Sequence, residues 1–321
     1  MFQFKYKILL AFFIALVSLC LYYTYISSLK PEAVLVPDDS KSENLAQAKV
    51  KPLLRDDNHE EGLETLKSQL LLMVTNATST YSIYVKPLGS GASLTINNEQ
   101  MKAASMIKLF IMAEAFRQEK VKLINFDEEI MITQHVKVGG SGTLQNSPGE
   151  SRKTIRELID LMIIESDNTA TNVLIHRLTM ENINELISEL GFKNTLLQRK
   201  MMDFQSAEKG KENYTSVVDI GIMLEKIYGG QCIGPEQDTR MLKILLQQTD
   251  NDKIPALLPG KHRVAHKTGE LLGIMHDGGI VYGDKQDYIV CIMTKDSKDA
   301  DATVKEIAVI SKVIYQFLND K

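Results

Sequence analysis

Ser105 and Lys108 stand at the head of an apolar stretch and could act together as a nucleophile and its base. Their spacing is close to one helical turn, so the hydroxyl and the amine would lie on the same face of a helix. Serine attacks only with the help of a base, and a lysine desolvated by apolar neighbours can lose its proton and serve as one. The same spacing also arises from a capping serine followed by a solvated lysine. Alone, it is therefore a weak signal.

A second polar group, Ser166-Asp167-Asn168, falls at a break between two predicted helices. Residues of these types are also the ones that cap helices, so the triplet has a purely structural interpretation. In a functional interpretation, Ser166 relays a proton and the amide of Asn168 contacts a substrate carbonyl.

The third group, Lys267-Thr268-Gly269, ends a strand-like run. An ammonium and a hydroxyl at that place could bind a substrate carboxylate, and Gly269 would let a ligand lie along the strand edge. A strand that ends in a turn explains the triplet equally well when it is taken alone.

The elements that must position these groups can be predicted from periodicity. Residues 106–119 are apolar on nearly every side, which predicts a helix in the middle of the protein. Thr154 and Glu157 form a capping box that opens a second apolar helix running to Glu165. Further helices are predicted over 60–74, 168–178, 180–190, 216–228, 236–249 and 302–318.

Strand patterns occur only near the two ends of the segment that carries these helices, residues 60–318. They cover residues 81–85, 92–96, 263–268, 279–282 and 288–294. Strands at both ends with helices between them predict an α+β fold, in which both terminal parts form one antiparallel sheet and an all-helical subdomain is inserted. A cleft between the two parts is the expected place for a site.

Taken together and in this order, the three groups resemble the signature of class A β-lactamases and penicillin-binding proteins, over residues 60 to 321. The resemblance implies that Ser105 is acylated with help from Lys108 and that Ser166 and Lys267 carry a proton to the leaving nitrogen. It also implies substrate binding by Asn168, Thr268, Gly269 and Glu270, with the backbone N–H groups of Ser105 and Glu270 as the oxyanion hole. No cofactor or metal is implied.

One element of the class A pattern is missing. Those enzymes carry a glutamate on a loop, which activates the water that releases the acyl group, and Met201 falls about where it should be. Asp203, Glu208 and Glu270 are candidate replacements, with Asp203 nearest in sequence, although all three could be surface charges. Glu212 is better placed to pair with Arg199 and close the loop.

Three functions remain open at this point. The first is a β-lactamase that forms an acyl-enzyme on Ser105 and hydrolyses the β-lactam amide bond. The second is a peptidoglycan D,D-peptidase or another exported serine hydrolase that uses the same acylation machinery, which the missing glutamate favours. The third is a sensing module that is acylated and barely turns over.

The first 58 residues differ from the rest of the chain. An apolar run over residues 8–28 follows Lys5 and Lys7 and is long enough for the roughly 20 residues that cross a bilayer, so we expect residues 1–30 to form an uncleaved membrane anchor, with a cleaved signal as the alternative. Residues 31–58 carry prolines and mixed charge without apolar periodicity, which indicates a tether. The hydrolase domain is expected over 59–321, outside the cell membrane.

Composition excludes some partners. The net charge of −4 and the lack of basic clusters give no reason to expect nucleic acid, and we expect a monomer that binds a small β-lactam or a peptidoglycan stem peptide. Cys232 and Cys291 are expected to be unpaired thiols, although pairing is open. His262 and His266 have the spacing of metal ligands on a strand, but no third ligand follows at a useful distance.

Overall fold

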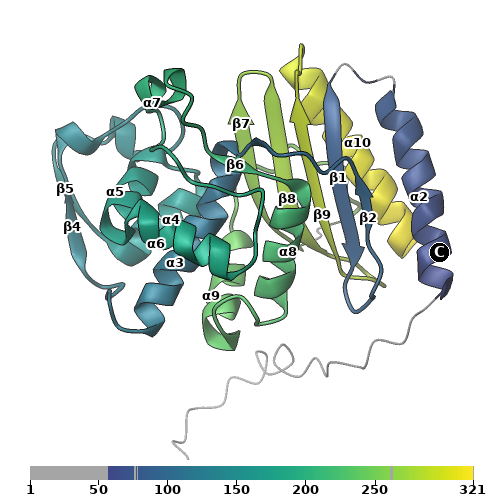
Figure 1. The fold of residues 1–321 in the computed structure, drawn as a ribbon, viewed down its shortest axis with the longest axis horizontal. Helices are drawn as coiled ribbons and strands as arrows, with labels where there is room; N and C mark the ends of the chain where they lie inside the picture. Colours follow the sequence, from purple (N-terminus) through teal and green to yellow (C-terminus); the bar gives the residue numbers. More distant parts are fainter. Residues whose placement is uncertain (1–56, 76, 78, 261–262, 321) are drawn as a thin grey trace, which may run out of the picture. The chain divides into compact units, whose positions relative to one another are not determined.

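The computed structural model describes residues 57–75, 77, 79–260 and 263–320. Its centre is an antiparallel five-stranded sheet with the strand order β2-β1-β9-β8-β7 (Figure 1). The strands are β1 (Thr80–Pro87), β2 (Leu94–Ile96), β7 (Arg263–Leu271), β8 (Ile274–Tyr282) and β9 (Tyr288–Lys295). The predicted sheet built from both terminal parts is confirmed, because β1 pairs along its whole length with β9.

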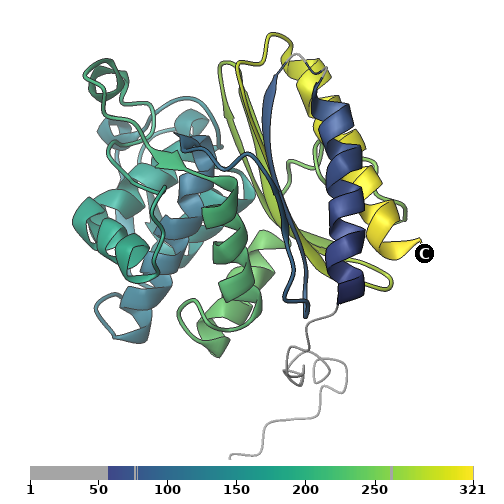
Figure 2. The same ribbon diagram turned by 45° about the vertical axis from the view of Figure 1, so that its right-hand side comes forward.

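Two helices from opposite ends of the described chain cover one face of the sheet (Figure 2). They are α2 (Asp57–Thr75) and α10 (Ala300–Asn319). Apolar side chains of both helices, including Leu66 and Ile314, form one core with the inward-facing residues of β1 and β9. Burying that apolar surface holds the two ends together.

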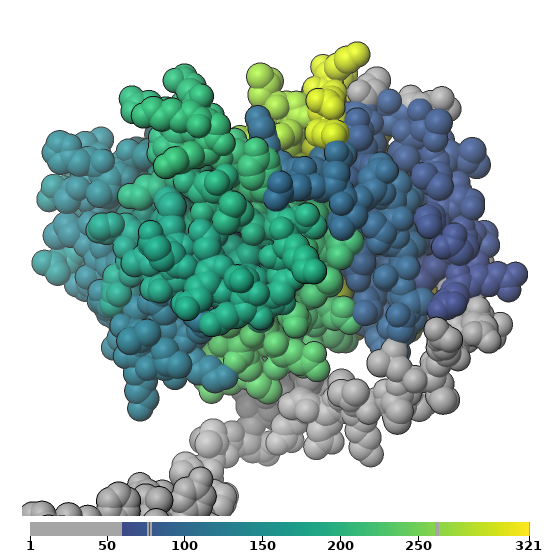
Figure 3. All heavy atoms as spheres, in the orientation of Figure 1, coloured from purple at the N-terminus to yellow at the C-terminus, as the bar shows by residue number. Residues whose placement is uncertain are grey.

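The inserted subdomain is helical, as predicted, and lies against the other face of the sheet. In the space-filling view of Figure 3, its teal and green segments adjoin the blue N-terminal strands. Its longer helices are α3 (Lys108–Lys120), α4 (Ile155–Ile164), α5 (Asn168–Leu178), α6 (Met180–Glu189), α8 (Val217–Tyr228) and α9 (Pro235–Leu245). The predicted capping box of Thr154 and Glu157 is confirmed at the start of α4.

Close packing fixes the inserted subdomain on the sheet. A Cβ atom on Gly221 of α8 would lie 2.3 Å from the Tyr84 ring of β1, and one on Gly278 of β8 would lie 3.0 Å from the Ile220 side chain. Only glycine permits such an approach of helix and sheet. Direct packing of α8 against the sheet therefore fixes the position of the inserted subdomain on the sheet.

Several short elements connect these layers. They are the one-turn 3-10 helix η2 (Ala104–Ile107), the helix α7 (Phe204–Glu208) and the paired strands β3 (Met101–Lys102) with β6 (Tyr214–Thr215) and β4 (Glu129–Ile132) with β5 (Ser151–Thr154). Among the residues described, no helix has both the length and the apolar character to span a bilayer. The predicted anchor over 1–30 and nearly all of the predicted tether lie outside those residues.

The strand prediction over 279–282 was too short, because β8 begins at Ile274. Its first half carries the polar residues His276 and Asp277, which are fully buried and satisfied internally. His276 bonds through Nε2 to the Lys102 carbonyl at 3.0 Å and accepts the Thr294 N–H at 3.2 Å. Burial lowers the pKa of His276 to about 4, so the ring is neutral and takes the place of an apolar core residue.

Candidate active site

Ser105 lies on the turn η2, immediately before α3. The structure therefore places it at the head of the buried helix, as predicted, although the first turn is 3-10 rather than α. The preceding Ala104 has a positive φ of 46°, which is uncommon for a residue with a side chain. Strained backbone of this kind persists only where the surroundings enforce it, and it often marks a functional site.

A cleft of about 290 Å³ opens beside Ser105. It is lined by Ser105, Ser141, Gly142, Glu165, Ser166, Gln248, Thr249, Asp250, Thr268, Gly269 and Glu270. All three predicted groups meet here or directly behind it. Ser105 is half-buried and lines the opening of this cleft.

Lys108 lies fully buried behind the cleft, and its amine contacts the second group. Its Nζ donates to the Ser166 carbonyl at 2.7 Å, to the Ser166 hydroxyl at 3.1 Å and to Asn168 Oδ1 at 3.0 Å. Burial, together with the nearby charge of Lys267, lowers the pKa of Lys108 well below its ordinary value. A neutral amine at this place can accept a proton.

Ser166 connects the two lysines. Its Oγ accepts hydrogen bonds from Lys108 and from Lys267, each at 3.1 Å. Because both lone pairs of this oxygen are occupied, the hydroxyl proton must point away from both amines. Ser166 has a φ of 56°, so the backbone is strained to hold the hydroxyl in this position.

The side chains of Asp167 and Asn168 make hydrogen bonds to other residues of the protein. Asp167 caps α5 through the Ala170 N–H at 2.8 Å and also accepts the Leu144 N–H at 2.8 Å. The amide of Asn168 donates to the Gly139 carbonyl at 3.0 Å and accepts from Lys108. These bonds tie the loop 139–144 to the motif, so the predicted contact of Asn168 with substrate stays a prediction.

The third group lies on β7, which is an edge strand of the five-stranded sheet in the described part of the chain. A Cβ atom on Gly269 would lie 3.2 Å from the Ser105 nitrogen, so the strand runs directly against the turn that carries Ser105. The predicted oxyanion hole, made by the backbone N–H groups of Ser105 and Glu270, stays a prediction.

Lys267 is also fully buried, and its Nζ bonds to Ser166 Oγ at 3.1 Å and to the Thr268 carbonyl at 2.9 Å. Burial lowers its pKa from 10.5 to about 8, against the opposing charges of Asp250 and Asp277. The ammonium therefore persists at neutral pH at a cost in folding free energy.

This cost gives a testable prediction for Lys267→Met. The shift in pKa corresponds to about 3 kcal/mol, and the two lost hydrogen bonds offset part of it, so we expect the variant to be more stable at pH 7 by about 1–2 kcal/mol. Because the folded pKa is lowered, the cost is present below about pH 8 and fades as the pH approaches the unfolded value of 10.5. Urea unfolding at pH 7 and pH 10 measures this, and a destabilised variant at pH 7 would contradict it.

Three carboxylates, two of which line the cleft, surround a buried lysine. Lys253 Nζ lies 2.6 Å from Glu270, 2.6 Å from Asp252 and 3.2 Å from Asp250. Oxygens of the three acids lie within 4.8 Å of one another, as in a metal site. Here the ammonium of Lys253 takes the place of such a cation, and the three acids raise its pKa against the effect of burial.

Asp203 and Glu208, two of the candidate replacements for the missing glutamate, do not line the cleft. Met201 is buried in the core, with its backbone held by the Asn172 side chain at 2.7 and 3.0 Å. Asp203 caps α7, and the Ser206 hydroxyl and N–H lower its pKa, which makes it a poor base. Glu208, at the end of α7, is exposed and is not among the residues lining the cleft. Of the three candidates, only Glu270 lines it.

Two predictions outside the three groups are confirmed. Arg199 and Glu212 form a buried ion pair at 2.8 Å, which closes the loop. Cys232 and Cys291 are free thiols, both buried. His266 lies on β7 and faces Asp277 at 2.9 Å and Asn251 at 3.3 Å, so its ring belongs to a hydrogen-bonded cluster, whereas His262 lies outside the described residues.

Sequence reasoning missed Glu165 and Asp250 as parts of the site. Glu165 follows α4 directly before Ser166, and its carboxylate accepts the Thr143 hydroxyl at 2.8 Å. Its position next to a motif residue was a usable signal. Asp250 lies in a polar run after α9, where no periodicity indicates that the segment turns back to the cleft.

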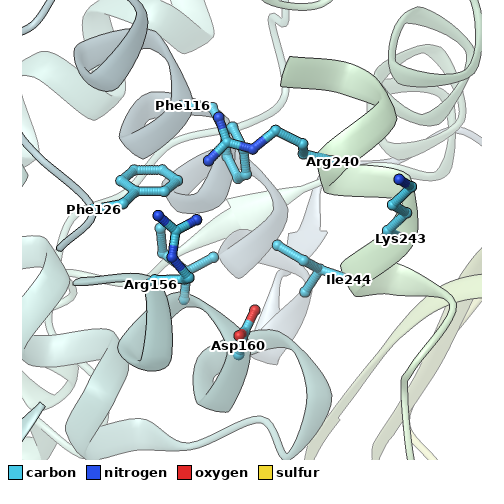
Figure 4. A pocket seen from close by; sticks show the side chains of 8 residues that line it. Phe116, Phe126, Arg156, Asp160, Arg240, Lys243 and Ile244 are labelled. Atoms are coloured by element: carbon cyan, nitrogen blue, oxygen red, sulfur yellow. The ribbon is translucent and has the colours of Figure 1, made fainter. Parts of the chain in front are cut away.

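A second hollow of about 170 Å³ lies between α3, α4 and α9 (Figure 4). The Arg240 guanidinium lies 4.9 Å from the Phe116 ring centre and 5.1 Å from that of Phe126, and Arg156 stacks on Phe126 at 5.6 Å. These contacts are typical of cation–π packing between helices. None of the three motif groups lines this hollow.

Comparison with known proteins agrees with this geometry. Residues 65–318 match the profile described as the "Beta-lactamase enzyme family". The chain is 26% identical over 251 residues to "Beta-lactamase AST-1" of Nocardia asteroides, covering 76% of this chain and 81% of that protein. It is 24% identical over 249 residues to a "Beta-lactamase" of Streptomyces lavendulae, covering 73% and 80%.

Solved structures show the same fold. The β-lactamase of Sphaerobacter thermophilus superposes with a TM-score of 0.74 at 25% identity, covering 79% of this chain and 96% of that one. PBP-A superposes with a TM-score of 0.73 at 29% identity and the same coverage, and a mutant of it is described as an acyl-enzyme complex with penicillin G.

Proposed function

The chain belongs to the beta-lactamase enzyme family and is a serine hydrolase of the class A β-lactamase type, and from this premise we propose that Ser105 forms an acyl-enzyme by opening the β-lactam amide bond. The observation that carries the proposal is the Ser166 hydroxyl held between Lys108 and Lys267 at the cleft of Ser105. An array of this kind can both remove a proton from a nucleophile and return it to a leaving group.

In the proposed acylation, Lys108 in its neutral form takes the proton of the Ser105 hydroxyl while Oγ attacks the carbonyl carbon. The developing oxyanion is stabilised by the backbone N–H groups of Ser105 and Glu270. The lowered pKa of Lys108 supports its role as base, because burial disfavours the charged form.

Collapse of the tetrahedral intermediate breaks the bond between carbon and nitrogen. Ser166 gives its proton to the leaving nitrogen and recovers one from Lys108, whose Nζ lies 3.1 Å away. Lys267 stays charged and orients the Ser166 hydroxyl. Thr268 and Asn168 are assigned to substrate binding by the family resemblance.

Release of the acyl group is the slow step in this proposal. The loop 199–203 presents a buried Met201 and a capping Asp203, so it supplies the cleft with no base to activate water. This observation also supports a second candidate function, a D,D-peptidase or penicillin-binding role on peptidoglycan stem peptides, in which a peptide takes the place of the β-lactam.

Intact mass spectrometry with a chromogenic cephalosporin separates these functions. Rapid colour without a lasting adduct indicates a β-lactamase, and a persistent adduct at Ser105 indicates a peptidase or a sensor. If neither colour nor an adduct forms, while the same protein remains folded by circular dichroism, the acylation proposal is wrong.

The lysine pKa values predict a bell-shaped pH dependence of acylation. Lys108 must be neutral, so the rate rises with pH and levels off well below the range of an ordinary amine. Lys267 must be charged, so the rate falls again as the pH passes about 8. Stopped-flow acylation between pH 5 and pH 10 measures both limbs, and a rate still rising at pH 9 would exclude this assignment.

We also propose where the enzyme works. The apolar residues 8–28 support an anchor over 1–30, with residues 31–58 as a tether and the hydrolase domain outside the membrane. We propose a monomer that binds a small β-lactam or a peptidoglycan stem peptide. Cell fractionation followed by carbonate washing tests the anchor, since an anchored chain stays in the membrane pellet.

A further inference from the structure

Helix α4 ends two residues before Ser166, and a distant segment of the chain supplies partners for the carbonyl groups of its last turn. Carbonyl groups at the end of a helix have no partner within the helix and must find one elsewhere. Here the Gln248 side-chain amide donates to the Ile163 carbonyl at 2.9 Å, and the Thr249 hydroxyl donates to the Ile164 carbonyl at 2.9 Å. The backbone that leads into Ser166 is therefore held by residues from outside its own helix.

Gln248 uses both ends of its amide for contacts with the backbone. The side chain is buried, and its Oε1 accepts the N–H groups of Thr249 and Asp250 at 2.9 and 3.0 Å, while its Nε2 donates to Ile163. Two accepted hydrogen bonds fill the capacity of an amide oxygen. Gln248 lines the cleft, but these contacts indicate that it supports the backbone there.

The segment that carries Gln248 is also fixed to the sheet. The side chain of Asn251 donates to the Gln248 carbonyl at 3.1 Å, and its Oδ1 lies 3.3 Å from Nε2 of His266 on β7. The same strand carries Lys267. This segment therefore joins the helix that leads into Ser166 to the strand that carries Lys267.

The position of Ser166 matters because its hydroxyl works at short distances. Its Oγ lies 3.1 Å from the amines of both Lys108 and Lys267. Its φ of 56° is uncommon for a residue with a side chain, so neighbouring contacts must hold the backbone in this conformation. A displacement of a catalytic group by about 1 Å can slow a reaction by about 10²-fold.

We propose that Gln248 is a positioning residue, whose amide fixes the end of α4 and thereby keeps the Ser166 hydroxyl where it can pass a proton to the leaving nitrogen. The inference rests on the proposed acylation of Ser105 and adds a residue to that same reaction. Gln248 takes up no proton and forms no covalent bond. It acts only through the backbone before Ser166.

The test is a double-mutant cycle of Gln248→Met and Ser166→Ala. Methionine has a similar length to glutamine and lacks the amide, so the variant removes the hydrogen bonds and keeps most of the volume. Acylation of Ser105 by one chromogenic cephalosporin is followed by stopped-flow absorbance and intact mass, and circular dichroism checks the fold of each variant. If Gln248 acts through Ser166, its substitution matters only while the Ser166 hydroxyl is present.

Gln248→Met is expected to lower the acylation rate constant by about 10- to 100-fold, with the dissociation constant of the noncovalent complex changed by less than about 2-fold. Ser166→Ala should lower the rate constant by about 10²- to 10⁴-fold, the range for loss of a group that transfers a proton. The double variant should then be as slow as Ser166→Ala alone. A purely structural role of Gln248 would instead make the two losses multiply.

Gln247→Met is the matched control. This neighbouring glutamine is exposed and donates to the Lys243 carbonyl at 2.9 Å, so it contacts α9 and not α4. It should leave the acylation rate unchanged with or without the Ser166 hydroxyl. Thr249→Val removes the hydroxyl bond to α4 at an exposed position, and it should slow acylation only while that hydroxyl is present. It replaces Gln248→Met if the latter does not fold.

The outcomes separate the two proposals. An unchanged rate for Gln248→Met, or losses that multiply in the double variant, with an adduct still formed at Ser105, overturns the positioning role and leaves acylation standing. Ser166→Ala that is acylated as fast as the natural chain also overturns it, because no proton then passes through Ser166. Absence of any Ser105 adduct on the natural chain overturns the proposed function together with this inference.

Discussion

Ser105→Ala is expected to abolish the covalent adduct and to lower kcat/KM for a chromogenic cephalosporin by about 10⁴- to 10⁶-fold, in line with loss of a nucleophile from a catalytic unit. The variant removes only one oxygen from a half-buried position on η2, so the fold should be unchanged. Stopped-flow absorbance and intact mass measured on the same sample report the rate and the adduct together.

Ser141→Ala is the matched control, because Ser141 lines the same cleft. We expect this variant to acquire the adduct, with the peptide map placing it at Ser105. An adduct on Ser105→Ala, or one that maps to Ser141 or Ser166 in the natural chain, would show that the nucleophile has been misassigned.

Lys108→Met is expected to slow acylation by about 10²- to 10⁴-fold, the range for loss of a general base. Methionine has a similar length and cannot take a proton, so the rising limb of the pH dependence should disappear while the falling limb near pH 8 from Lys267 remains. Stability should change little, because Lys108 must give up its proton to be buried, and removing this cost offsets the loss of the hydrogen bonds that its amine makes.

Lys312→Met, on the exposed side of α10, provides the control for loss of one positive charge. It should keep both limbs of the pH profile and the rate of the natural chain. If Lys108→Met instead keeps the rising limb, another group is the base, and Lys108 only positions Ser166.

Much of this fold could be predicted from local patterns. Helices α4 and α5 are marked by caps and by apolar periodicity, both of which depend on neighbours a few residues away. The three motif groups could be placed on their elements for the same reason. Their meeting at one cleft was predicted only because the family resemblance supplied the arrangement.

The remaining features depend on contacts between distant segments, which periodicity does not report. Asp277 reads as a turn residue, yet it is buried on β8 because His266 and the Ile254 N–H, at 2.9 and 3.0 Å, satisfy its carboxylate. The helix predicted to 249 ends at Leu245, which frees Asp250 and Lys253 to pair with each other at the cleft. The prediction for Asp203 considered sequence distance alone, and the carboxylate instead accepts the Ser206 N–H at 3.0 Å as the cap of α7.

The pairing of β1 with β9 has a consequence for how the protein folds during its synthesis. Thr80 of β1 pairs with Lys295 of β9, which lies more than 200 residues further along the chain. During synthesis, the sheet therefore stays open until β9 has left the ribosome, and contacts so far apart in sequence form slowly. A product stalled before β9 would lack the strand that joins β1 to β8, so acylation of Ser105 would report that β9 has been made and that the sheet has formed.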